Sequence, residues 1–286
     1  MKIPKVYLLV FASPLTNTYS QTLTSAIISN NDVTIYEESA PGLLTQNNAY
    51  DPVAALQGTA SAAGGNIELF ASSDDAVYDD ASASGAFANA DPTVLTAGFS
   101  DASTVTVSGL DGQDWFVDSA DNYTTSYGAN NLANRWFGDF LAAMSDQSSG
   151  AANSFIIGNE GSLFDTFKTN GGFAQISDPN VSFIATSDGI VSVGLGGFND
   201  TTERVAMLLQ VQPDQLAAFF QNGLQVSEVA RVNGQEAYGF KAVDSGVLFD
   251  DGVDSYDATY VVGVPEPSSS LLLLFAGATA LVRRKR

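Results

Sequence analysis

Residues 181–194 read VSFIATSDGIVSVG, and this stretch decides the fold class. Its two runs, 181–187 and 190–194, are rich in β-branched and aromatic residues, which are typical of strands. Asp188-Gly189 lies between them and is a favoured pair for a tight turn, because glycine adopts positive backbone angles without steric cost. The stretch therefore predicts an antiparallel β-hairpin.

Further strands are expected on both sides of this hairpin. A second hairpin is predicted from the runs 226–232 and 237–243, which flank a loop built on Asn233-Gly234. A last strand is expected at residues 258–262. The first half of the chain contains short β-prone runs separated by Ala-, Ser-, Gly- and Asp-rich stretches, and these runs cover residues 33–37, 67–71, 93–97 and 104–110.

Helices are predicted only in the middle of the chain. Residues 129–145 place their large apolar side chains on one helical face, with Asn130 or Asn131 as the N-cap. A shorter helix is expected near residues 162–168, ended by the Asn-Gly-Gly sequence at 170–172. A third is expected at 213–221, where Pro213 suits the first turn.

Together these patterns predict an α+β fold with a mainly antiparallel β-sheet and a few mid-chain helices. Residues 16–263 are expected to form one acidic body. In an alternative division of the chain, residues 16–128 form a looser β-rich part of this body.

The composition excludes several classes of function. The chain has 32 acidic and 11 basic residues, and it contains neither cysteine nor histidine. Its negative charge opposes binding to nucleic acid, which is itself a polyanion. Without thiols or imidazoles the chain has no disulfide, no Cys/His metal site, no cysteine nucleophile and no Ser-His-Asp triad.

The N-terminus has the pattern of a short secretory signal peptide over residues 1–12. Lys2 and Lys5 precede the apolar residues 6–12 (VYLLVFA), and Val10 and Ala12 are small enough to precede a cut at Ser13. A buried first strand is the alternative interpretation of this apolar run.

The C-terminus has three parts in a fixed order. The first part is a proline-glutamate box made of Val264, Pro265, Glu266, Pro267 and Ser268. An apolar run at 271–282 follows it, and the third part is a basic cluster made of Arg283, Arg284, Lys285 and Arg286. The prolines favour an extended box that no helix or central strand includes, which leaves it accessible to an enzyme. The 12-residue apolar run would span about 18 Å as a helix against a hydrocarbon core of about 30 Å, so it suits transient insertion as a single-pass sorting helix. The basic cluster is expected to stop transfer on the cytoplasmic side.

This tail, residues 264–286, resembles the C-terminal signal of PEP-CTERM proteins of Gram-negative bacteria. The resemblance implies that the membrane protease exosortase is a partner and cleaves near the box. It also implies delivery to the cell envelope, the outer surface or the extracellular matrix, often together with exopolysaccharide and biofilm formation. The body resembles a cyanobacterial-type group of such proteins around residues 134–137 (NRWF) and 177–180 (SDPN), and this likeness implies no activity.

Acidic loops raise the possibility of calcium, which takes six to eight oxygen ligands. The favoured cluster is Asp250, Asp251, Asp254 and Asp257, and the other two are 74–80 and 111–121. None matches the EF-hand pattern, so solvated loops that keep an exported protein soluble are the alternative, and no cofactor is required.

Two further interpretations concern carbohydrate. Paired carboxylates could hydrolyse a polysaccharide, but pairs arise by chance in a chain with so many acidic residues. Aromatic residues could form a sugar-stacking platform, although Trp136 falls on the apolar helix face, and packing at a strand edge better explains Trp115-Phe116. We therefore expect an exported, non-enzymatic envelope or biofilm-matrix protein; the alternative is a secreted carbohydrate- or calcium-binding module, and a polysaccharide hydrolase is a remote one.

Overall fold

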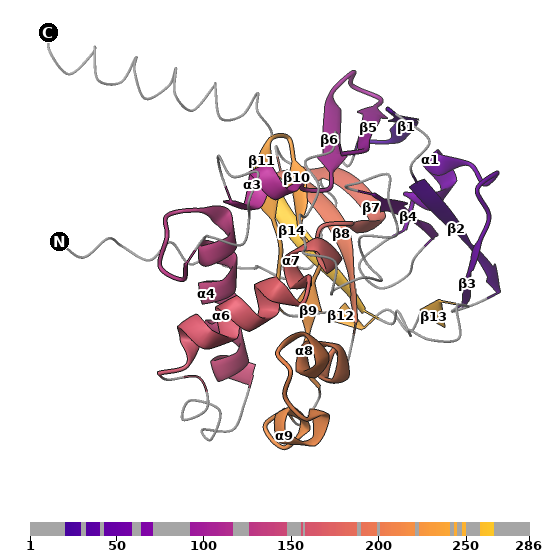
Figure 1. The fold of residues 1–286 in the computed structure, drawn as a ribbon. Coiled ribbons are helices and arrows are strands. Elements are labelled where there is room, and N and C mark those ends of the chain that lie inside the picture. The colour runs from indigo at the N-terminus through magenta and orange to yellow at the C-terminus, as the bar shows by residue number, and fades with distance from the viewer. Residues whose placement is uncertain are drawn as a thin grey trace, which may run out of the picture.

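The computed structural model describes the body of the chain with several gaps (Figure 1). The described residues are 21–29, 33–40, 43–58, 64–70, 92–116, 126–147, 156, 158–187, 190–198, 201–220, 223–240, 243–244, 248–249 and 258–265. The predicted signal peptide, most of the C-terminal tail and the favoured acidic cluster at 250–257 lie outside them.

Five of the described strands form a small antiparallel sheet. Their spatial order is β1 (Leu23–Ile28), β5 (Val94–Phe99), β6 (Thr104–Ser108), β10 (Ala230–Val232) and β11 (Gln235–Ala237). The first three come from the start of the chain and the last two from its end. The β10–β11 turn is the predicted Asn233-Gly234, and both residues have positive φ angles.

A larger sheet contains the other described strands. Its order is β12 (Val243–Asp244), β14 (Ala258–Pro265), β8 (Ile190–Phe198), β7 (Asn180–Ser187), β4 (Gly65–Leu69), β2 (Val33–Ala40), β3 (Leu43–Gln46) and β13 (Leu248–Phe249), with β9 (Val226–Ser227) paired to β8 beyond this path. Within this described part, β13 and β3 form the only parallel pair. The predicted hairpin is confirmed as β7–β8, and the strand predicted at 258–262 is confirmed as β14, which is longer than expected.

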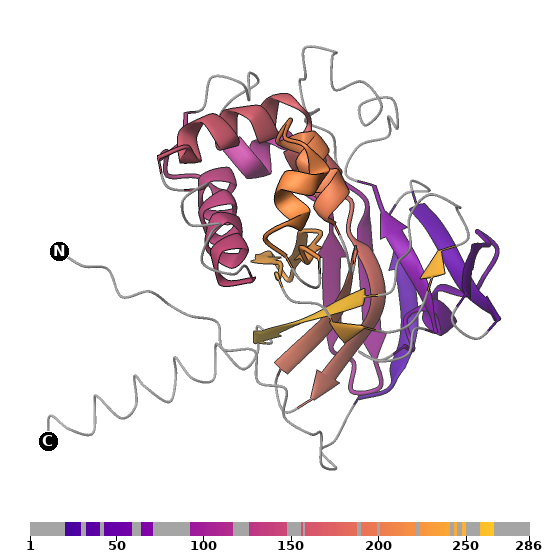
Figure 2. The same cartoon turned by 90° about the horizontal axis from the view of Figure 1, so that it is seen from below.

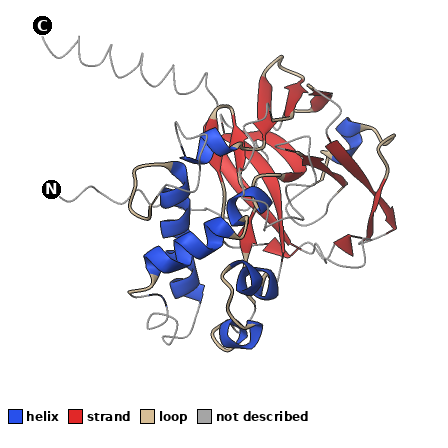
Figure 3. Ribbon diagram, viewed as in Figure 1, coloured by secondary structure: helices blue, strands red, loops and turns tan. Residues whose placement is uncertain are grey.

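The helices lie mainly between β6 and β9 in the sequence. They are α1 (Pro52–Ala55), α3 (Gly112–Phe116), α4 (Leu132–Gln147), α6 (Glu160–Thr169), α7 (Gly172–Gln175), α8 (Thr202–Leu208) and α9 (Pro213–Ala217). Figures 2 and 3 show that α4, α6, α7, α8 and α9 gather on one side of the sheets. We call α3 and these five helices the helical layer.

The long predicted helix is confirmed, and its start has a clear physical cause. The side-chain oxygen of Asn131 accepts a hydrogen bond from the backbone N–H of Asn134 at 3.0 Å, as an N-cap does. The predicted second helix is α6, followed by Gly171 in the left-handed region. The third is α9, which ends earlier than expected, at Ala217.

Two apolar clusters hold the body together. The sandwich core is aliphatic and receives side chains from both sheets, for example Leu95 and Val107 from the small sheet and Ile67 and Val193 from the large one. The aromatic core lies within the helical layer and is built around Trp115, Trp136, Phe137, Phe140, Phe164, Phe167 and Phe173.

These elements agree with an α+β fold dominated by antiparallel sheet. Strands from both sides of residue 128 share both sheets, so neither sheet is divided there. In the described part of the chain no helix has the length and hydropathy needed to cross a bilayer, and the predicted sorting helix at 271–282 lies outside that part.

Candidate functional site

The predicted sorting box begins inside the large sheet. Strand β14 pairs with β8 along its whole length, and the last two pairs are Val264 with Val191 and Pro265 with Ile190. The sequence predicts that no helix or central strand includes the box; its first two residues belong to β14, but at an end of this strand where, among the described residues, only β8 pairs with it. Glu266, Pro267, Ser268 and the basic residues 283–286 lie outside the described residues.

The position of Pro265 explains how a proline can occupy this strand. The other neighbour of β14 is β12, which pairs only with Ala258 and Thr259 at the opposite end of the strand. Pro265 is thus the final residue of β14, at a place where the described residues provide no second neighbour. Proline is tolerated at such an edge because its missing N–H leaves no sheet hydrogen bond unmade.

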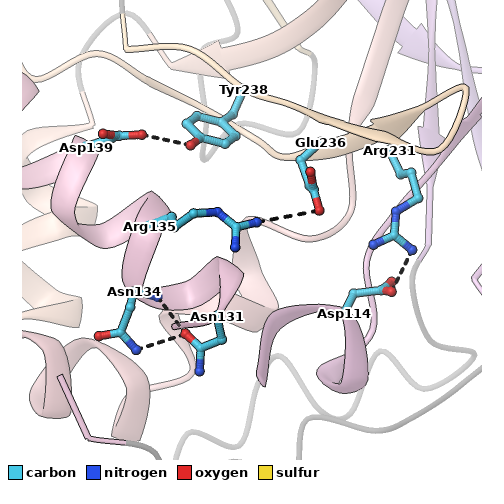
Figure 4. A network of polar contacts seen from close by, with 8 residues as sticks. All are labelled: Asp114, Asn131, Asn134, Arg135, Asp139, Arg231, Glu236 and Tyr238. Carbon is cyan, nitrogen blue, oxygen red and sulfur yellow. Dashed lines mark hydrogen bonds and ion pairs between the residues drawn. The ribbon is translucent and has the colours of Figure 1, made fainter. Parts of the chain in front are cut away.

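A second concentration of polar side chains joins the helical layer to the β10–β11 hairpin (Figure 4). It consists of three contacts, which we call the polar interface: Asp114 with Arg231, Arg135 with Glu236, and Asp139 with Tyr238. The first is the shortest, with 2.6 Å between the Arg231 Nη1 and Asp114 Oδ1 atoms, and both side chains are more than half buried. The second spans 3.8 Å between more exposed side chains.

Asp114 also belongs to a reciprocal cap at the start of α3. The Asp111 carboxylate accepts from the Asp114 N–H at 2.9 Å, and the Asp114 carboxylate accepts from the Asp111 N–H at 3.1 Å. Burial raises the pKa of the Asp111 carboxyl above its ordinary value; the Asp114 N–H opposes this rise and the Asp114 charge adds to it. Both carboxylates therefore accept backbone hydrogen bonds that stabilise the start of α3, and Asp114 also forms an ion pair with Arg231.

Tyr238 makes the third contact of the polar interface. Its hydroxyl donates to Asp139 Oδ2 at 2.9 Å. Burial and the negative charge of Asp139 raise the pKa of the Tyr238 phenol well above its ordinary value of 10.0. The phenol therefore stays neutral and acts as a hydrogen-bond donor.

The acidic clusters predicted to bind calcium are only partly described. Asp111 and Asp114 are used as above, whereas the rest of that cluster, the cluster at 74–80, and Asp250, Asp251, Asp254 and Asp257 lie outside the described residues. Among the described residues no group of three or more acidic side chains is placed to hold a metal ion.

The aromatic residues do not form an open platform. Trp115, Phe116 and Trp136 are buried in the aromatic core, and Trp115 and Phe116 lie in α3 rather than at a strand edge. The Trp115 indole donates to the Ser177 hydroxyl at 2.7 Å, which satisfies its buried N–H and joins α3 to the segment at 177–180. Tyr127 is 38% exposed, but its ring contacts Phe137 and Phe164.

One polar site was not found from the sequence. Asn66, Asn180 and Ser182 are all at least 95% buried, and one side-chain oxygen of each has no hydrogen-bond partner. Glu68 is paired directly with Asn180 across β4 and β7, so its carboxylate is on the same face. This face is opposite to the one that Ile67 and Val181 turn toward the sandwich core.

We call these four residues the oxygen-lined face. Ser182 and Phe183 lie over Gly194, where any side chain would collide with them. A buried oxygen without a donor costs about 1–3 kcal/mol, so such groups are usually satisfied by water or an ion. The face offers amide, hydroxyl and carboxylate oxygens, which are ligands for a hard cation.

Comparison with known families identifies the tail. Residues 263–286 match the model of the PEP-CTERM protein-sorting motif. The chain is therefore a protein that carries a PEP-CTERM sorting signal, and the first three matched residues, 263–265, are the end of β14. No curated protein and no solved structure matches the chain, so the likeness of the body to a cyanobacterial-type group stays a prediction.

Proposed function

We propose that this is a non-enzymatic protein of the cell envelope or biofilm matrix, sorted through its PEP-CTERM tail and cleaved by exosortase. The observation that carries the proposal is the sorting motif at 263–286, which continues directly from the last strand of the body. The motif implies an exported protein with exosortase as its processing partner. The outer surface or extracellular matrix of a Gram-negative-type bacterium is the proposed destination, and exopolysaccharide is a proposed partner there.

The charge of the body supports this destination. Without residues 1–12 and 264–286 it keeps five basic and 31 acidic residues, a net charge of −26. A polyanion of this kind has no electrostatic attraction to an anionic bilayer and stays soluble once it is released. Each carboxylate of the polar interface has a hydrogen-bond or ion-pair partner within the protein. This supports a structural role, and not a catalytic one, for these charged side chains.

The mass of the mature protein tests the proposal. The full chain is expressed in a strain with exosortase and in a matched strain without it, and the C-terminus is determined by intact mass spectrometry. We expect a chain shortened near the box only when exosortase is present. Glu266→Gln should slow the shortening, whereas Glu203→Gln, an exposed glutamate in α8, should not. Recovery of chains ending at Arg286 from the envelope of the exosortase strain would contradict the proposal.

The oxygen-lined face favours a second candidate, a secreted calcium-binding module. Its three unpartnered oxygens and the Glu68 carboxylate match the ligand preference of Ca²⁺. A cation bound only by the folded state raises the midpoint of thermal unfolding, with about 2.7 kcal/mol of stabilisation at a hundredfold excess over Kd.

Thermal unfolding with and without millimolar Ca²⁺ separates the possibilities. A rise in midpoint that Ser182→Ala and Glu68→Gln abolish would place the ion on the oxygen-lined face. A rise abolished only by Asp250→Asn with Asp254→Asn would place it in the acidic cluster predicted from the sequence. No rise would remove calcium, and a glycan array would then test the carbohydrate-binding form of this candidate.

A further inference from the structure

Both ends of the described chain reach the body at the same end of the large sheet. The backbone N–H of Gln21, the first described residue, donates to the Thr186 carbonyl at 3.2 Å. Thr186 is paired with Val191 across β7 and β8, and Val191 is paired with Val264 of β14. These contacts place four residues side by side on adjacent backbone segments. We call them the terminal row: Gln21, Thr186, Val191 and Val264.

The two ends are close in space as a result. Neighbouring strands lie about 4.8 Å apart, so the three steps of the terminal row separate Gln21 from Val264 by about 15 Å. The predicted signal peptide precedes Gln21, and the sorting tail follows Val264. Both hydrophobic segments of the sequence thus join the body at one place, although they lie at opposite ends of the chain.

The linker to the tail is short compared with the body. Five residues, 266–270, separate Pro265 from the first leucine of the apolar run, and a fully extended chain covers about 20 Å between these two positions. A compact chain of this length has a radius of gyration of about 19 Å, so its width exceeds the linker. While the apolar run is in a membrane, the end of the large sheet that carries Pro265 therefore stays within about 20 Å of the bilayer surface.

An exposed apolar side chain lies beside the terminal row. Ile190 is 51% exposed and is the residue paired with Pro265. In the sequence, the acidic residue Asp188 comes two positions before Ile190, and burying a charged side chain in hydrocarbon is costly.

We propose that the end of the large sheet marked by the terminal row is the surface that faces the bilayer during sorting, and that Ile190 contacts the lipid–water interface there. This inference rests on the proposed function, since it requires the tail to be inserted. The partner is the lipid surface itself, and the contact forms without exosortase.

Site-specific fluorescent labelling tests this orientation, because the chain has no native cysteine. Gln21→Cys places a bimane label in the terminal row, and Ile190→Cys places one beside it. Ile27→Cys, in β1, is the matched control, because Ile27 is 64% exposed but lies six residues further along the chain from Gln21, which is about 20 Å for an extended chain. Met207→Cys, on α8, is a second exposed control.

Each labelled full-length chain is reconstituted in phosphatidylcholine–phosphatidylglycerol vesicles with nitroxide-labelled head groups, and flotation measures membrane association. We expect all variants to float, with quenching at positions 190 and 21 and none at 27 and 207. Flotation with equal quenching at all four positions, or with none at 190 and 21, would overturn the orientation and leave the sorting proposal standing. Failure of the unlabelled full chain to float would contradict the tail insertion on which both proposals depend.

Discussion

The helical layer and the two sheets bury different kinds of side chain. Apart from Phe99, the buried residues of the sandwich core are Val, Ile, Leu and Ala, contributed mainly by strands from both halves of the chain, whereas the aromatic core is built from residues of the central stretch. The Trp136 ring, for example, stacks on the rings of Phe140 and Phe167 and contacts the Trp115 ring edge-on. In a chain without disulfides, the aromatic core draws its contact area from a few large side chains, and the sandwich core distributes it over many small ones.

This difference predicts unequal sensitivity to truncation. Trp136→Ala should lower the free energy of unfolding by about 3–5 kcal/mol, because it empties a site surrounded by aromatic rings. Val193→Ala in the sandwich core should cost about 2 kcal/mol, because it removes only two methyl groups. Urea denaturation of the two full-length variants measures both values. Equal costs would show that the two cores do not differ in this way.

Trp136→Phe provides a control for the size of that effect. The indole N–H of Trp136 is buried and has no hydrogen-bond partner, so phenylalanine removes an unsatisfied donor while keeping a ring. Its cost should be well below that of Trp136→Ala. If the two substitutions cost the same, ring contacts are not what stabilises this core.

The polar interface joins the two regions, and its shortest contact should matter most. Arg231→Met should lower the free energy of unfolding by about 1–2 kcal/mol, because it leaves the partly buried Asp114 carboxylate without its charged partner. Arg135→Met is the matched control, since its ion pair is longer and more exposed and should contribute about 0.5 kcal/mol or less. Thermal or urea unfolding compares the two, and a larger loss for Arg135→Met would reverse the expected ranking.

Tyr238 should make the attachment of the hairpin sensitive to alkaline pH. Its pKa is raised in the folded protein, so its contribution to stability is fully present below the ordinary phenol pKa of 10.0 and decreases as the pH rises above it. Tyr238→Phe should cost about 1 kcal/mol at neutral pH and reduce the loss of stability above pH 10. Urea titrations across this pH range test it, and an unchanged alkaline slope would exclude this tyrosine as the cause.

The smallest effect is expected where the helical layer begins. The raised pKa of Asp111 means that the folded state favours its protonated form, so its contribution is favourable below pH 3.8 and is lost as the pH rises through the folded-state pKa. Asp111→Asn keeps the cap and removes the charge, so stability at pH 7 should stay the same or increase by a few tenths of a kcal/mol. A clear loss at pH 7 would show that the charge itself stabilises the start of α3.

The strands were predictable where sequence and local geometry agree. The β7–β8 hairpin follows from β-prone runs on either side of a glycine turn, and the long helix follows from its apolar face. Of the second hairpin, the Asn233-Gly234 turn was predictable, but its second strand is Gln235–Ala237 and not the expected run 237–243. The run at 226–232 is not one strand, because the Val229 N–H donates to the Ile176 carbonyl. Helices α3 and α8 are too short for their periodicity to stand out, and tertiary packing determines them.

The candidate sites also differ in how far the sequence alone predicts them. The sorting tail is a contiguous motif, so its order of box, apolar run and basic cluster identifies it without a fold. The oxygen-lined face depends on the register that brings Glu68 opposite Asn180, two residues more than a hundred positions apart. No local pattern encodes that pairing. The polar interface likewise joins Asp114 to Arg231 across a similar separation.

The pairing of β14 with β8 also sets the order in which the protein can fold. Strand β14 is the last element of the body to leave the ribosome, and until it arrives that side of β8, which includes the uncharged sequence VSVGLGG at 191–197, has no strand partner. Such an open edge invites pairing with other chains, and long-range partners of this kind form slowly. The large sheet is therefore completed only after the start of the sorting signal has been synthesised, and a chain truncated before Ala258 would be prone to aggregate.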